Sequence, residues 1–74
     1  MPPLNPLSYR EVKRKLEAAG FSEVSQKGSH VKFGKQTSEG FRTAIVPRHK
    51  EIRIGTLKSI LEQAGLTREE FENL

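Results

Sequence analysis

Two amphipathic helical patterns, one near each end of the chain, bracket a stretch with the composition of strands. Apolar residues spaced three or four positions apart form one helical face near the start and a second one further on. The members are Val12, Leu16 and Ala19 in the first pattern, and Leu57, Ile60, Leu61 and Ala64 in the second. Each pattern has a single apolar stripe and so needs a surface to cover. The segment between them must supply that surface.

Capping signals set the ends of the first helix. Ser8 and Glu11 have the spacing of a capping box, in which a hydroxyl and a carboxylate satisfy free amides at a helix start. Gly20 stands where a left-handed residue ends a helix, and Phe21 follows as an apolar anchor. The pattern predicts a helix over residues 9–19.

Three strands are predicted between the helices. They cover Phe21 to Gln26, His30 to Gly34, and Phe41 to Val46. Gly28 interrupts the chain after the first, the polar stretch from Lys35 to Gly40 reads as a hairpin loop, and Pro47 stops the third. The third strand carries apolar residues on both sides, so its inward face stays open.

A basic loop, residues 48–54, leads to the second helix, which Thr56 is expected to cap and Gly65 to end. Thr67 and Glu70 form a second capping box that starts a short terminal helix, with Phe71 anchoring it.

The order helix, three strands, helix predicts an α+β fold with an antiparallel meander and both helices on one face of the sheet. Period-2 alternation then points Val31 and Phe33 toward the helices, and His30 and Lys32 onto the open face. At 74 residues the chain is expected to be one domain, 1–74, with a proline-containing extended lead-in over residues 1–7.

Charge is concentrated in the middle of the chain. Residues 27–58 hold eight lysines and arginines against Glu39 and Glu51, while the whole chain has a net charge of +4. The segment is either an anion-binding surface or a solvated basic one. The chain has no cysteine, which fits the reducing cytoplasm, and lacks the ~20-residue apolar run needed to span a bilayer. Two histidines without cysteines or clustered carboxylates make a poor metal site, so no cofactor is expected.

Gly28-Ser29-His30 is the stretch richest in possible chemistry. Histidine transfers protons near neutral pH, and Lys27 and Lys32 flank it with positive charge. Gly28 either lets the backbone approach a phosphate or is an ordinary turn glycine. Ser29 either hydrogen-bonds a phosphate or the imidazole, or is simply a solvated hydroxyl. His30 itself is either catalytic or an idle surface residue.

The chain resembles the HicA toxins, small messenger-RNA interferases of bacterial and archaeal toxin–antitoxin pairs. The resemblance rests on an ordered series of short motifs. These are Ala19-Gly20-Phe21, Lys27-Gly28-Ser29-His30, Val46-Pro47-Arg48-His49, Gly55-Thr56-Leu57, Ile60-Leu61 and Ala64-Gly65-Leu66. Many members carry further histidines or aromatics directly after the catalytic one, where this chain has Val31 and Lys32.

The resemblance implies a double-stranded-RNA-binding-domain-like α-β-β-β-α fold, a catalytic role for His30, and a HicB antitoxin as partner. On this reading the chain is an endoribonuclease that acts on messenger RNA without metal. Arg48, Lys50 and Arg53 then bind phosphates, and His49 contacts RNA or orders its loop. Two alternatives stay open: a non-catalytic RNA-binding module of the same fold, and an adaptor that binds a protein through the open sheet face.

Overall fold

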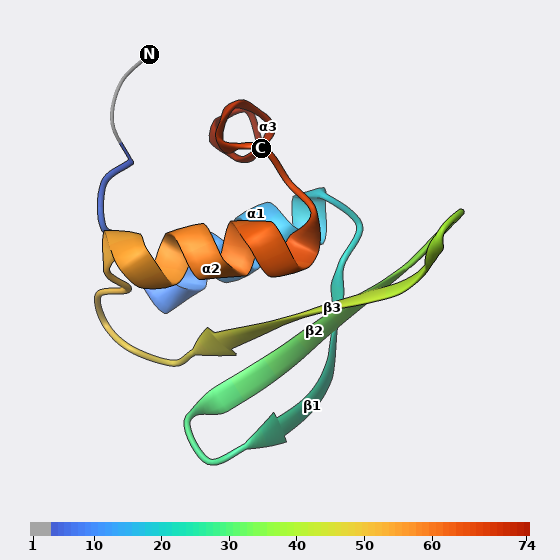
Figure 1. Cartoon of the computed structure of the whole chain (residues 1–74). Helices are drawn as coiled ribbons and strands as arrows, with labels where there is room; N and C mark the ends of the chain where they lie inside the picture. The colour runs from blue at the N-terminus through green and yellow to red at the C-terminus, as the bar shows by residue number, and fades with distance from the viewer. Residues whose placement is uncertain (1–3) are drawn as a thin grey trace.

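Two helices lie on one side of a three-stranded antiparallel sheet, and a third short helix follows (Figure 1). The computed structural model describes residues 4–74. The elements in chain order are α1 (Tyr9–Ala18), β1 (Ser22–Lys27), β2 (His30–Thr37), β3 (Gly40–Pro47), α2 (Ile54–Ala64) and α3 (Arg68–Glu72). Strand β2 is central, with β1 and β3 at the edges. The predicted α+β meander, with a short C-terminal helix, is confirmed.

The core lies between the helices and the sheet, as the apolar stripes predict. Val12 and Leu16 of α1 are fully buried, and so are Leu57 and Ile60 of α2. The sheet contributes Val31, Phe33, Ala44 and Val46, all fully buried. Ala44 and Val46 thus identify the inward face of the third strand, which its sequence left undecided. Phe41 and Ile45 of the same strand are exposed.

The helix ends match the expected signals with two corrections. Ser8 accepts a hydrogen bond from the Glu11 amide at 3.1 Å, but the Glu11 carboxylate binds Arg14 and does not complete the box. The hydrogen bond that the Arg14 guanidinium donates to this carboxylate lowers the pKa of Glu11. The predicted Thr56 cap is wrong, because α2 starts at Ile54 with Arg53 as its N-cap. At Thr67 the full capping box forms, and Phe71 is buried as predicted.

The early start of α2 follows from a contact with the N-terminal segment. Leu7 and Ile52 exchange two backbone hydrogen bonds, of 3.2 and 2.6 Å, and Ile52 is buried. The chain is therefore held at Ile52 and turns into the helix directly after it. The extended lead-in predicted over residues 1–7 lies, for residues 1–3, outside the described residues. Within the remainder, Leu4 is buried in the core.

Both strand connections are tight. The predicted loop over Lys35 to Gly40 is wrong, because β2 continues to Thr37 and pairs with Gly40, leaving Ser38 and Glu39 as the turn. Thr37 Oγ1 stabilises this turn by donating to the Gly40 carbonyl at 2.7 Å. Polar composition therefore indicated an exposed end of the hairpin here, and not a loop.

Candidate functional site

His30 lies on the face of the sheet that the helices leave uncovered, as strand alternation predicts. Its neighbours in the register are Lys27 on β1 and Pro47 on β3. Residues directly opposite each other in an antiparallel pair share a face. Lys27 and His30 therefore stand on the same side, next to the turn that joins their strands. We call this uncovered side the open face.

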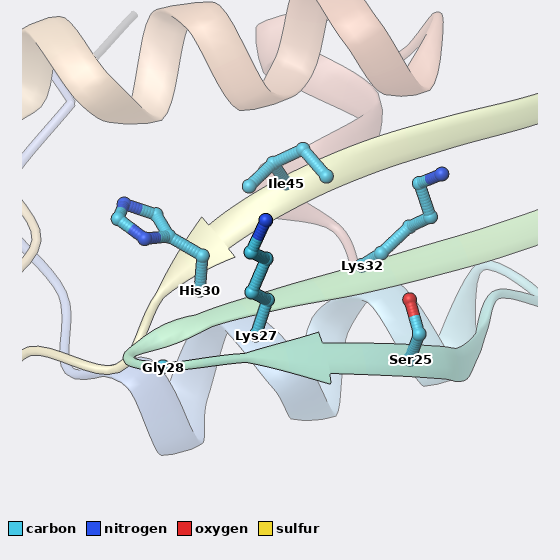
Figure 2. Close-up of a pocket in the computed structure, with 6 residues that line it drawn as sticks. All are labelled: Ser25, Lys27, Gly28, His30, Lys32 and Ile45. Atoms are coloured by element: carbon cyan, nitrogen blue, oxygen red, sulfur yellow. The ribbon is translucent and has the colours of Figure 1, made fainter.

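A depression of about 690 Å³ surrounds His30 on the open face. Figure 2 shows its lining side chains rising from the same side of the three strands. The lining residues are Ser25, Lys27, Gly28, His30, Lys32 and Ile45. The side chains of Lys27, Lys32 and His30 therefore line the same depression. This arrangement suits an anionic ligand that undergoes proton transfer.

The turn between β1 and β2 consists of Gly28 and Ser29. Gly28 has a φ of +60°, while Ser29 is not among the residues with positive φ. Glycine at the first central position is the pattern of a type II′ hairpin turn, whose twist matches that of the strands. The Ser29 carbonyl accepts a hydrogen bond from the Arg48 amide at 2.6 Å, which ties the turn to the end of β3. The position of His30 is thus set from both neighbouring strands.

We expect Gly28→Ala to lower the free energy of unfolding by about 1–2 kcal/mol, because an L side chain at this φ is strained. No atom lies within 4 Å of the added Cβ, so the cost comes from the backbone alone. Urea denaturation measures it, with Ser29→Ala in the same turn as the matched control. Equal stability of the two variants would show that the turn does not require glycine.

Two lining residues, Ser25 and Ile45, were not among the predicted site residues. Both lie opposite Lys32 in the register, one on each neighbouring strand. An irregularity between Glu23 and Ser25 makes Val24 an extra residue in β1. This bulge shifts the alternation, so Ser25 and Lys27 share the open face with His30. Without the bulge, strict alternation from the buried Phe21 would place Ser25 and Lys27 on the face that packs against the helices.

The remaining predicted basic residues lie outside the depression. Arg48 places its guanidinium 5.4 Å from the ring centroid of Tyr9, the first residue of α1. The His49 carbonyl accepts from the Tyr9 amide at 3.2 Å, while the Lys50 side chain is exposed. Burial and the Glu23 carboxylate raise the pKa of Tyr9. We call Arg48, His49, Lys50 and Arg53 the basic segment, of which Arg48 and His49 contact the start of α1 at Tyr9.

Two other cations of the central segment are used within the fold. Lys35 donates to the Ala19 carbonyl at the end of α1, at 2.7 Å. Arg42 donates to the Gln63 carbonyl near the end of α2, at 3.3 Å. Cations at these positions complement the negative ends of the helix dipoles. The central charge is therefore only partly available to an anionic ligand.

Residues 4–74 contain neither a metal-binding cluster nor a membrane-spanning helix. In this range no group of three His, Asp or Glu side chains is arranged to hold a metal ion. Nor does any helix in the same range combine the length and the apolar character needed to cross a bilayer.

Comparison with known proteins identifies the family. A search of curated proteins found no match to the chain. The family model described as the HicA toxin of bacterial toxin–antitoxin systems matches residues 9–66. The match runs from the first residue of α1 to just beyond α2, and so includes the sheet and the whole depression. It covers most of the chain, and on this basis the protein belongs to the HicA toxin family.

Proposed function

We propose that the protein is a metal-independent endoribonuclease that cleaves messenger RNA, with His30 as general acid or base. One observation carries the proposal: His30 is exposed in a depression that Lys27 and Lys32 also line, on the uncovered face of the sheet. The family supplies the biological role, that of the toxin in a toxin–antitoxin pair.

The chemistry needs few protein groups because RNA carries its own nucleophile. The 2′-oxygen attacks the adjacent phosphorus, the bond from phosphorus to the 5′-oxygen breaks, and a 2′,3′-cyclic phosphate and a 5′-hydroxyl result. His30 takes the proton from the 2′-hydroxyl or gives one to the leaving 5′-oxygen. Lys27 and Lys32 stabilise the charge that develops on the phosphoryl oxygens. Water or a second group completes the other proton transfer.

Gly28 and Ser29 support this step in different ways. The space where a Gly28 Cβ would lie is open, with no atom within 4 Å, so a phosphate can approach the backbone closely. Ser29 is exposed in the same turn but does not line the depression, and in this proposal its hydroxyl hydrogen-bonds a phosphate of the bound RNA. In this proposal Gly28 and Ser29 help to bind the phosphate and take no part in proton transfer.

The basic segment of Arg48, His49, Lys50 and Arg53 binds RNA beyond the depression in this proposal. All four side chains are exposed, and the hydrogen bond from the Arg48 amide to Ser29 joins the segment to the His30 turn. Contacts to phosphates would position the substrate without reading its sequence. A HicB-type antitoxin, bound in the cytoplasm, would silence the toxin by covering the site.

Cleavage of RNA in the presence of EDTA tests the proposal. We expect the purified protein to cut an RNA oligonucleotide in EDTA, and not to cut one with a 2′-deoxy substitution at the scissile nucleotide. Gel electrophoresis of end-labelled RNA measures both. Undiminished cutting of the 2′-deoxy oligonucleotide would exclude the 2′-hydroxyl as nucleophile. Binding of RNA without any cleavage would favour the non-catalytic RNA-binding module.

A further inference from the structure

The open face also exposes large apolar side chains. Val24 is 51% exposed, Phe41 58% and Ile45 37%. Ile45 lines the His30 depression, and Phe41 lies further along the same strand, opposite Gln36 of β2. His30 and Gln36 are six residues apart on β2, which corresponds to about 20 Å. The apolar surface therefore begins in the depression and continues away from it along the strands.

Gly34 gives the Phe41 ring a defined position. A Cβ at Gly34 would lie 2.8 Å from Phe41 Cε2 and 2.8 Å from Val24 Cγ2. The ring therefore occupies the space above the Gly34 backbone, with Val24 beside it. It is restrained over the sheet and still exposes more than half of its surface. This is the form of a stacking platform and not of a core residue.

The charge of the open face favours a nucleic acid as the ligand. Lys27, His30 and Lys32 share this face with the apolar residues. By the register, no Asp or Glu of the described strands stands there, since Glu23 is opposite the inward-facing Phe33. The Glu23 carboxylate instead forms an ion pair with Lys13 of α1, with 3.7 Å between Glu23 Oε2 and Lys13 Nζ. Cationic side chains bind the phosphates of a nucleic acid, and an exposed aromatic ring stacks against its bases.

We propose that Phe41 stacks against a base, and that the open face binds single-stranded RNA along β2 and β3 from His30 to Phe41. The inference rests on the proposed function and adds the conformation of its substrate. A ring that lies over the sheet contacts the flat face of a base, which a duplex keeps within its stack. The stacked base is then several nucleotides from the bond that is cut.

Binding of an uncleavable RNA tests the proposal separately from catalysis. The probe is a fluorescein-labelled 2′-O-methyl oligoribonucleotide of twelve nucleotides, single-stranded or annealed to its complement, and fluorescence anisotropy gives the Kd. We expect Phe41→Ala to weaken binding of the single strand roughly 5- to 100-fold, as stacking contacts do, and to leave duplex binding nearly unchanged. Phe41→Tyr should restore single-strand binding, and Phe41→Leu, which keeps apolar cover over Gly34, should not.

Ile54→Ala is the matched control, because Ile54 is also a partly exposed apolar residue, at 38%, but lies on α2. It should leave the Kd unchanged. Phe41→Trp adds a direct readout, since the chain has no tryptophan. Its fluorescence should be quenched by the single strand, and that of Ile54→Trp should not. Circular dichroism checks that every variant is folded.

Three results would overturn the inference. They are an unchanged single-strand Kd in folded Phe41→Ala, an equal loss of duplex binding, and absence of quenching in Phe41→Trp. If the wild-type protein cleaves RNA while Phe41→Ala binds normally, only the stacking role fails. If the wild type binds no RNA, the proposed function fails as well. If Phe41→Ala binds RNA normally but escapes neutralisation by the antitoxin, the face is a protein interface and the proposal is wrong.

Discussion

His30→Ala is expected to abolish growth arrest on induced expression and to slow RNA cleavage by about 10²- to 10⁴-fold. That range is the usual contribution of one general acid or base. The loss should come from chemistry and not from unfolding, because the His30 side chain is exposed on the open face and takes no part in the buried core. Single-turnover cleavage at saturating protein measures the effect, and thermal unfolding checks the fold.

His49→Ala is the matched histidine control, because the basic segment that holds it lies outside the depression. In our proposal His49 binds RNA, so its loss should raise KM and leave kcat nearly unchanged. A folded His30→Ala variant that cleaves at the wild-type rate would remove His30 from the mechanism. A fall of kcat in His49→Ala equal to that in His30→Ala would give the second histidine a share in proton transfer.

Phe33→Ala is expected to have the largest effect on stability. Phe33 is fully buried between the helices and the sheet, and its ring centroid lies 6.5 Å from that of Tyr9. Truncation of a buried phenylalanine costs about 3–5 kcal/mol, which approaches the whole stability of many small domains. We expect a large loss of folded protein at 37 °C, measured by urea denaturation followed by circular dichroism.

Lys32→Ala, one residue away, is the control for Phe33→Ala. Lys32 is exposed on the open face, so its truncation should change the free energy of unfolding by no more than about 0.5 kcal/mol. The pair tests the alternation on which the site depends. Comparable destabilisation by both substitutions would show that β2 does not present opposite faces at these positions.

The helix ends show how far short-range signals predict this fold. Gly20 and Gly65 end α1 and α2 with φ of +97° and +71°, and the Thr67 box forms as its spacing predicts. Such signals depend on residues within about four positions, so a sequence pattern contains them in full. The start of α2 was missed because it depends on the pairing of Leu7 with Ile52, forty-five positions apart.

The residues of the site likewise fall into those that a local pattern predicts and those that depend on contacts between distant segments. Alternation along β2 was enough to place His30 and Lys32 on one face and Phe33 on the other. Lys27 and Gly28 were predicted from their positions next to His30 in the chain, and both line the depression. Ser25 and Ile45 could not be predicted, since their place depends on which residues of β1 and β3 lie opposite Lys32. Ile45 was ambiguous because β3 carries apolar residues on both sides, and Phe41 could not be told from a core residue.

The sequence by itself determined the element order, the apolar stripes, the turn glycines and the face on which His30 lies. Each of these follows from local backbone preferences and from the fixed periods of helix and strand. Only the tertiary structure decided which residues of the neighbouring strands share the open face with His30. The bulge at Val24 brings Ser25 and Lys27 onto the open face, and Gly34 makes room for the Phe41 ring. Strand register depends on contacts between segments distant in the chain, and no local pattern encodes those contacts.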